Sequence, residues 1–166
     1  VGRSHECDFP EEVKNVPVMT KPKIDPKASS KDIDNQIVNL VKQGLSVYDI
    51  DITALKDAKP DVILTQDQCE VCAVSLKDVT DAVRNEIGKA KVISLKPMKF
   101  NDILDDIIKV GEAIGRKKRA QQVVEQIGKR KKYITDKTHA IGYTPKVACI
   151  EWIDPIMTAG NWVPEM

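Results

Sequence analysis

KPDVILTQ, residues 59–66, is a short apolar run that follows a proline and is rich in β-branched residues. Two further runs have the same form: KVISLKP at residues 91–97 and KVACIEW at residues 146–152. Their apolar residues are nearly continuous instead of alternating, which is typical of strands buried on both faces of a parallel sheet. We therefore predict buried strands over 61–66, 91–96 and 146–152.

Helical patterns lie between these runs. SSKDIDNQIVNLVKQG offers cap residues at Ser29 and Ser30 and ends at Gly44, and SLKDVTDAVRNEIG begins at Ser75 and ends at Gly88. In both, apolar residues recur at the spacing of one helix face. Strands that alternate with helices predict βαβ units, and so an α/β, Rossmann-like lobe with a parallel sheet.

From Asn101 to about Thr138 almost every residue favours helix. Asn101 is a plausible N-cap. Gly115 predicts a break, after which a second helix runs from Arg116 to Thr138, with a length of about 34 Å at about 1.5 Å per residue.

Composition limits the class of protein. Of 166 residues, 42% are hydrophobic, 31% charged and only 4% aromatic, so the core must consist mainly of aliphatic side chains. Residues 1–115 carry 16 basic and 20 acidic residues, a net charge of −4, and residues 116–166 carry 10 and 5, a net charge of +5. No apolar run approaches the about 20 residues that a membrane helix needs.

The excess positive charge lies in RKKR, residues 116–119, and KRKK, residues 129–132. These runs are about 13 residues apart, or about 220° around a helix, so they do not form one stripe. No aromatic residues interleave with them. We therefore favour a solvated helix surface over a nucleic-acid binder, which stays an alternative.

Cysteine chemistry leaves several interpretations open. Cys69 and Cys72 form a Cys-x-x-Cys motif after a predicted strand; a structural role ranks first, a redox pair second and half of a zinc site third. Cys149 lies in an apolar run and is predicted to be buried. SHECDFP, residues 4–10, could hold a metal, but adjacent residues of an extended chain point to opposite sides, so a polar loop is preferred.

No nucleophile–base pair, paired-acid motif or glycine-rich phosphate loop is present in the sequence. The sequence therefore makes no case for an enzyme, and we assign no catalytic residue, no catalytic cofactor and no resident metal.

Four segments together carry a resemblance to a known family. They are VGRSHECDFPEEVKNVPVMT, YDIDITALKDAKPDVILTQDQCEVCAVS, the long helix, and CIEWIDPIMTAGNWVPEM. They resemble the substrate-binding proteins of ABC transporters that carry cobalamin (vitamin B12) and related corrinoids. The resemblance implies two α/β lobes joined by one rigid helix, a ligand captured between the lobes, and delivery to a membrane permease.

The resemblance also implies how the chain is divided. Residues 1–115 would be a first lobe without the family's first strand and helix, 116–140 the connecting helix, and 141–166 the beginning of a second lobe whose remainder is missing. The protein would be extracytoplasmic, either periplasmic or anchored to the outer face of the membrane. It would act as a monomer when complete, without nucleic acid.

Gln66 and Asp67 lie at the C-terminal end of a predicted strand, and ligands of open α/β sheets bind outside the carboxyl ends of strands. The resemblance adds the loop of Ser4, His5, Glu6 and Cys7, whose polar groups would contact ligand amides. It also adds Asp154 and the two tryptophans. Ligand-binding residues are thus predicted at Ser4, His5, Glu6, Cys7, Gln66, Asp67, Trp152, Asp154 and Trp162.

Trp152 and Trp162 would supply flat apolar area to a corrin ring, although a core role is an equal alternative. Asn161 stands where family members often carry His, which argues against metal coordination at this loop. Alternative ligands on the same scaffold are an iron-siderophore and haem.

YDIDITALKD, residues 48–57, reads most simply as a solvated turn and helix start. The family has an acidic residue near this point that docks on the permease. Thr53, which is not acidic, occupies the matching position here. The resemblance therefore gives only weak support for a docking role of the neighbouring Asp49 or Asp51.

Overall fold

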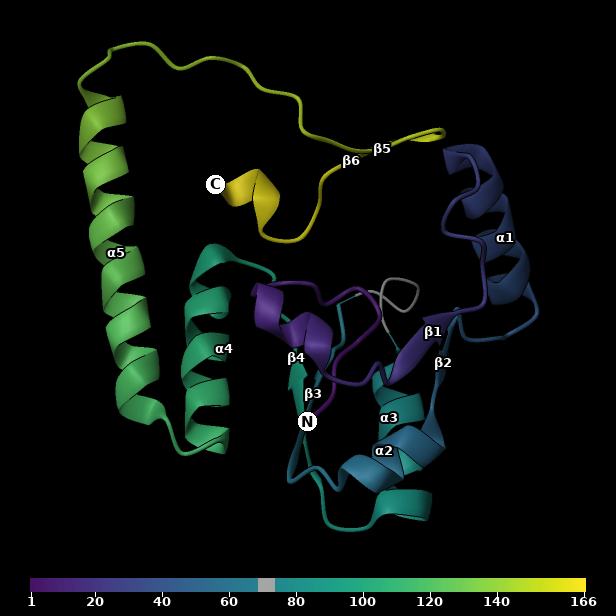
Figure 1. The fold of residues 1–166 in the computed structure, drawn as a ribbon. Helices are drawn as coiled ribbons and strands as arrows, with labels where there is room; N and C mark the ends of the chain where they lie inside the picture. Colours follow the sequence, from purple (N-terminus) through teal and green to yellow (C-terminus); the bar gives the residue numbers. More distant parts are fainter. Residues whose placement is uncertain (69–73) are drawn as a thin grey trace. The chain divides into compact units, whose positions relative to one another are not determined.

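The structure is a computed structural model that describes residues 1–68 and 74–166 (Figure 1). Two compact units can be distinguished: residues 1–96 with 153–155, and residues 97–152 with 156–166. Helices combine with small parallel and antiparallel sheets, so the predicted α/β class is confirmed. Within the described ranges, no helix combines the length and apolar character that a bilayer span requires.

The first unit is organised around a parallel pair of strands. β3 (Val62–Gln66) pairs in parallel with β4 (Lys91–Leu95), and Leu64 lies opposite Ile93. Two of the predicted strands and their parallel direction are therefore confirmed. The connection between them contains α3 (Leu76–Ala82), as a βαβ crossover requires.

The helical segment that starts with α3 begins and ends where the sequence predicts. Ser75 caps it, since its side chain accepts a hydrogen bond from the Asp78 amide at 3.0 Å. The helix continues through one π-helical turn, η2 (Val83–Ile87), and stops at Gly88, whose φ of 91° favours glycine. The aliphatic core of this unit comprises Met19, Val47, Leu55, Val79, Ala82, Val83 and Ile93.

One pair of antiparallel strands was not predicted from the sequence. β1 (Thr20–Pro22) pairs with β2 (Tyr48–Ile50), with Thr20 opposite Ile50. The strands flank α1 (Ser30–Lys42), which is capped by Ser29, and β2 is followed by α2 (Ile52–Ala58). η1 (Glu11–Asn15) precedes β1. Strands this short present too few positions for an apolar period to be recognised.

The second unit contains two antiparallel helices, α4 (Phe100–Ala113) and α5 (Lys117–His139) (Figure 1). The predicted break is confirmed: Gly115 has a φ of 69°. The prediction of Asn101 as N-cap was wrong. Lys99 holds that position, and the Asp102 carboxylate accepts hydrogen bonds from the amides of Met98 and Lys99, both at 2.9 Å.

The strand predicted over 146–152 was wrong in length and in burial. β5 covers only Ile150–Ile153, pairs with β6 (Ile156–Thr158), and is exposed. Cys149 is also exposed, contrary to prediction. A short turn, η3 (Val163–Glu165), ends the chain, and Glu165 accepts a hydrogen bond from the Phe100 amide at 2.9 Å.

Gly111 marks the close approach of α4 to the start of α5. A Cβ at Gly111 would overlap the Cβ of Ala120 and lie 3.3 Å from the Arg116 carbonyl oxygen. We expect Gly111→Ala to lower the free energy of unfolding by about 1–3 kcal/mol, because overpacking outweighs the gain in helix propensity. Urea unfolding monitored by circular dichroism measures this change.

Gly128→Ala is the matched control. No atom of the described residues lies within 4 Å of a Cβ at Gly128, which is also in a helix. This substitution should stabilise the protein by about 0.5–1 kcal/mol through propensity alone. Equal effects of the two substitutions would contradict close packing at Gly111.

Candidate ligand-binding and docking residues

The loop of residues 4–7 is held by one arginine. Nη1 of Arg3 donates hydrogen bonds to the backbone carbonyls of Ser4 at 3.2 Å, His5 at 3.3 Å and Cys7 at 2.9 Å. Three carbonyl oxygens that converge on one guanidinium fix the path of the loop. The Arg3 side chain therefore holds the backbone of the loop, and the side chains of residues 4–7 can contact other groups.

Thr20 joins this loop to β1. Its hydroxyl oxygen lies 3.1 Å from the His5 amide nitrogen and 2.8 Å from His5 Nδ1, and it donates to Ser4 Oγ at 3.3 Å. A hydroxyl has only one hydrogen, so a donation to Ser4 leaves lone pairs for His5. The network is therefore complete when His5 carries its ring proton on Nδ1.

The His5 ring is largely enclosed. Its side chain is 21% exposed, and its centroid lies 5.2 Å from that of Tyr48 with a 37° angle between the rings. His5 Nε2 is buried and has no hydrogen-bond partner among residues 1–68 and 74–166. It lies 3.8 Å from Glu6 Oε1, a contact that becomes an ion pair if His5 is protonated. The Glu6 carboxylate itself is 72% exposed and accessible to a ligand.

Burial raises the pKa of the Tyr48 phenol, and the negative charge of Glu6 raises it further. Both causes act in the same direction because each disfavours the phenolate. Tyr48 therefore stays a neutral hydroxyl at physiological pH.

Gln66 and Asp67 lie at the carboxyl end of β3, as predicted. Gln66 pairs in register with Leu95, and its side chain donates a hydrogen bond to the Gln68 side chain. The Asp67 amide donates to the Leu95 carbonyl at 2.9 Å, and its carboxylate lies 3.8 Å from Lys96 Nζ. Parallel strands end at one edge, so this edge is polar and carries charges of both signs.

The remaining predicted ligand residues lie on the C-terminal segment. Trp152 in β5 and Trp162 before η3 are half-buried, and Asp154 in the β5–β6 turn is exposed. Asn161 adopts a left-handed φ of 54°, a conformation that asparagine tolerates. A tight turn at Asn161 therefore sets the direction in which the chain enters Trp162.

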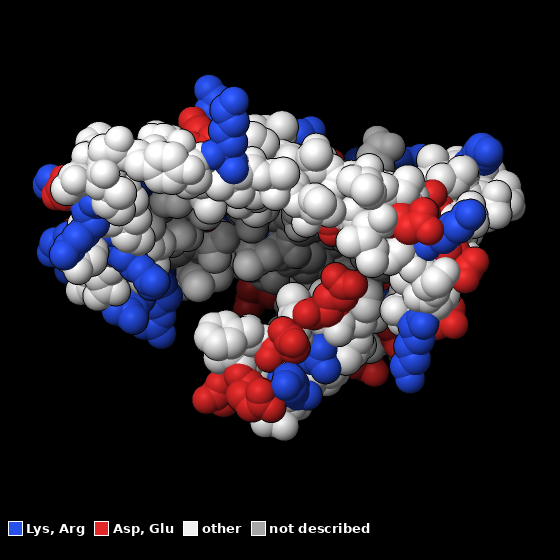
Figure 2. All heavy atoms as spheres, turned by 90° about the horizontal axis from the view of Figure 1, so that it is seen from above, with Lys and Arg blue, Asp and Glu red and all other residues white. Residues whose placement is uncertain are grey.

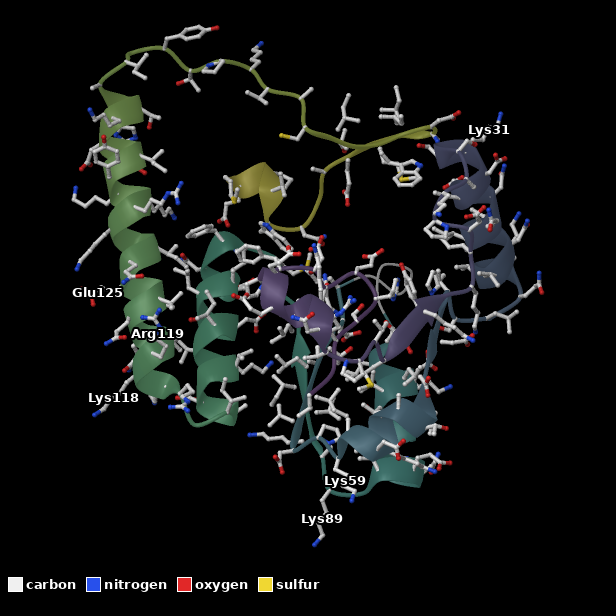
Figure 3. All side chains as sticks on the ribbon, in the orientation of Figure 1. Lys31, Lys59, Lys89, Lys118, Arg119 and Glu125 are labelled. Atoms are coloured by element: carbon white, nitrogen blue, oxygen red, sulfur yellow. The ribbon has the colours of Figure 1, made fainter. Side chains whose placement is uncertain are left out.

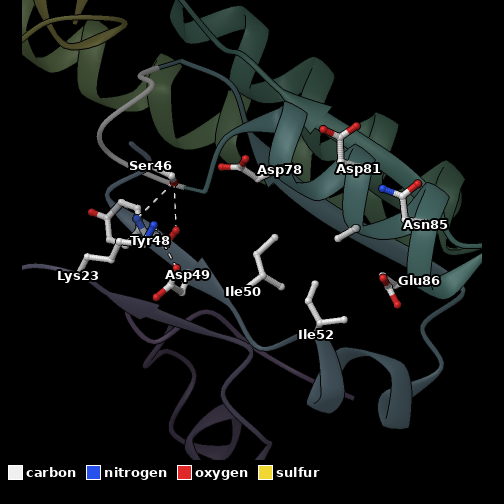
Figure 4. A pocket seen from close by; sticks show the side chains of 11 residues that line it. Lys23, Ser46, Tyr48, Asp49, Ile50, Ile52, Asp78, Asp81, Asn85 and Glu86 are labelled. Carbon is white, nitrogen blue, oxygen red and sulfur yellow. Dashed lines mark hydrogen bonds and ion pairs between the residues drawn. The ribbon is translucent and has the colours of Figure 1, made fainter. Parts of the chain in front are cut away.

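An acidic groove of about 360 Å³ opens on the first unit (Figure 4). Ile50 and Ile52 line one wall and Asp78 and Asp81 the other (Figure 4). The remaining charged residues of the lining are Lys23, Asp49 and Glu86. Asp78, Asp81 and Glu86 were not predicted as site residues. Their spacings of three and five residues in LKDVTDAVRNE place them on one broad side of a helix.

Ion pairing divides these acids into two groups. Asp49 pairs with Lys23 at 3.1 Å, and Glu86 pairs with Lys56. For Asp78 and Asp81, no ion pair is present among the described residues. The groove therefore carries uncompensated negative charge.

Asp49 and Asp51 differ in what their carboxylates contact. Asp51 caps α2, because its side chain accepts a hydrogen bond from the Ala54 amide at 2.9 Å. Asp49 lies in β2 and lines the acidic groove. Asp49 is itself paired with Lys23, but it lines the same groove as the acids Asp78 and Asp81.

The structure describes two of the four cysteines. Cys7 and Cys149 are free and exposed. Cys69 and Cys72 lie outside the described residues. Across residues 1–68 and 74–166, no group of three or more His, Cys, Asp and Glu side chains is arranged to hold a metal ion.

A family model described as periplasmic binding protein matches residues 9–165. The chain belongs to the periplasmic binding protein family. This family of extracytoplasmic, non-catalytic solute binders supports a role in ABC import and implies a permease partner and a small-molecule ligand. Among curated proteins and solved structures, the comparisons find no match to the chain.

Thr20→Val tests the network that holds the loop of residues 4–7. Valine keeps the shape of threonine but removes the hydroxyl that contacts His5 and Ser4. We expect a loss of about 1–3 kcal/mol of stability and a shift of the His5 nitrogen signals toward a mixture of tautomers. Nitrogen NMR of the labelled imidazole measures the second effect.

Thr20→Ser retains the hydroxyl and serves as the control. It should preserve the tautomer that carries the proton on Nδ1. An unchanged imidazole spectrum in Thr20→Val would show that Thr20 does not set the state of His5.

Glu6→Gln tests the electrostatic contribution to Tyr48. Removal of the negative charge should lower the pKa of Tyr48, but burial, the larger cause, should keep it above about 10. Carbon NMR of labelled tyrosine over an alkaline titration separates Tyr48 from the other tyrosines. A pKa that does not fall would mean that Glu6 lies away from the phenol in solution.

Proposed function

We propose that this protein is the solute-binding component of an ABC importer and that its solute is a corrinoid of the cobalamin type. Membership of the periplasmic binding protein family supports the general role. The corrinoid follows from the resemblance carried by the N-terminal loop, the segment around Gln66, and the tryptophan-containing C-terminal segment.

The observation that carries the proposal is the prearranged loop of residues 4–7. Arg3 and Thr20 use their hydrogen bonds to hold the loop, while Glu6 keeps an exposed carboxylate. A loop that is ordered before binding avoids part of the entropic cost of binding. Corrinoids carry peripheral amides, whose N–H groups suit a carboxylate or carbonyl acceptor.

The other contacts would divide by chemistry. Gln66 and Asp67 offer polar groups at the end of β3, and Trp152 and Trp162 offer flat apolar faces. A large ring with apolar faces and an amide periphery matches both kinds of group. Ser4, His5, Cys7 and Asp154 complete the proposed contacts.

For docking we propose Asp49 together with the acidic groove beside it. Asp78 and Asp81 add negative charge to the same groove, which suits basic residues of a permease. Asp51 is the weaker candidate because it caps α2.

Two alternatives differ in their ligand or chemistry. An iron-siderophore or haem would use the same scaffold, and Asn161 in place of His makes coordination at that loop unfavourable. A Cys-x-x-Cys redox or metal module would depend on Cys69 and Cys72.

Calorimetric titration of the protein with candidate solutes tests the ligand. We expect saturable binding of cobalamin and cobinamide, no comparable binding of a ferric hydroxamate or haem, and weaker binding of both corrinoids by Glu6→Gln. A carboxylate–amide hydrogen bond predicts a loss of about tenfold.

Glu12→Gln is the matched control, since Glu12 is exposed in η1 and outside the proposed contacts. Binding of haem or the iron chelate alone would replace the corrinoid with that ligand. Absence of all binding would remove the corrinoid proposal, and equal losses in both variants would remove Glu6 from the contacts.

A further inference from the structure

α5 carries two rows of charged side chains that differ in how their charges are balanced. The first, here called the acid-free stripe, consists of Arg119, Gln126, Arg130, Tyr133 and Lys137. The second, the compensated stripe, consists of Lys118, Glu125, Lys129, Lys132 and Asp136. Both rows are exposed.

Helical geometry aligns the acid-free stripe. At about 100° per residue, Arg119, Arg130 and Lys137 fall within about 20° of one direction, and at about 1.5 Å per residue they span about 27 Å. The basic runs do not align as blocks, but these single members of them do. The three cations can therefore contact one flat surface at the same time.

Ion pairs neutralise most of the other row. Lys129 Nζ lies 2.6 Å from Glu125, and Lys132 Nζ lies 2.9 Å from Asp136. Figure 3 shows Lys118 and Glu125 on the outer side of the helix, away from α4. The paired Lys129 lowers the pKa of Glu125 through a hydrogen bond and its charge, so this pair stays ionised.

The acid-free stripe has no such compensation. Among the described residues, Arg119, Arg130 and Lys137 form no ion pair. Arg119 is 3.5 Å from the Gln122 side-chain oxygen, and Lys137 lies over the Tyr133 ring at 5.5 Å. In Figure 2, the Lys and Arg side chains of α5 gather at the left edge of the view.

An aromatic residue lies within the row of cations. Tyr133 is 63% exposed and lies between Arg130 and Lys137 along the stripe. Just beyond the helix, Ile141 is 67% exposed and Tyr143 is 73% exposed. Tyrosine favours the boundary between water and lipid, where its ring is buried and its hydroxyl hydrated.

We propose that the acid-free stripe of α5 rests on an anionic phospholipid surface. A straight row of cations can contact phosphate groups that are spread over a plane. The tyrosine within the row can insert its ring at the level of the lipid headgroups. Nucleic acid is less favoured, because the row has one tyrosine instead of repeated aromatics and the family acts outside the cytoplasm. This proposal does not depend on the identity of the solute.

Vesicle co-sedimentation of the chain tests the proposal. We expect binding to vesicles with about 30% phosphatidylglycerol in phosphatidylcholine at about 50 mM KCl, loss of binding at about 500 mM KCl, and no binding to pure phosphatidylcholine. Arg119→Gln/Arg130→Gln/Lys137→Gln should weaken binding about 100-fold, from about fivefold for each cation.

Lys118→Gln/Lys129→Gln/Lys132→Gln removes the same net charge from the other row and is the matched control. It should weaken binding less than about tenfold, since two of its lysines are already paired with acids. Circular dichroism verifies that both variants keep α5.

Three results would overturn the proposal. These are no binding of the unmodified chain to anionic vesicles, equal losses in the two triple variants, and binding to duplex DNA that is tighter than binding to the vesicles. The last would assign the stripe to nucleic acid, and the second would leave only a net-charge effect.

Discussion

Parallel pairing of β3 with β4 is the constraint on which the first unit depends. Parallel strands need a crossover, and the segment that holds α3 supplies it. The same pairing brings the carboxyl ends of both strands to one edge, where Gln66 and Asp67 follow. A loss of register here would remove both the core position of Ile93 and the polar edge.

The N-terminal loop depends on a second, polar constraint. Arg3 donates to three backbone carbonyls of the loop, and Thr20 contacts the amide and Nδ1 of His5, so the order of the loop comes from hydrogen bonds and not from apolar burial. Such a loop can present Glu6 to solvent without collapsing onto the core. The charges of the chain are also separated: the acidic groove lies on the first unit and the acid-free stripe on α5.

The sequence predicted those elements that are long or capped by a clear signal. β3, β4, α1, α3, and the break between α4 and α5 follow from apolar period, serine caps and glycine. β1 and β2 escaped prediction, because strands of three residues show no period. Asn101 failed as a cap, because the side chain of Asp102, three residues beyond the actual cap Lys99, accepts hydrogen bonds from the free amides.

The candidate site was harder to predict than the fold. Gln66 and Asp67 could be placed because the end of a strand is visible in sequence. Thr20 could not, since its contact with His5 joins residues far apart in the chain. The three aligned cations of α5 were hidden inside two basic runs, and only the helix bounds and ion pairs separated them from their neighbours.

Hydrogen exchange measured by mass spectrometry, on the protein with and without cobinamide, is the most direct test of the proposed solute binding. The account predicts slower exchange on ligand addition in the peptides that contain residues 4–7, 66–67 and 152–162, and unchanged exchange in α1. Protection that is absent from all three segments, or that is confined to α1, would contradict it.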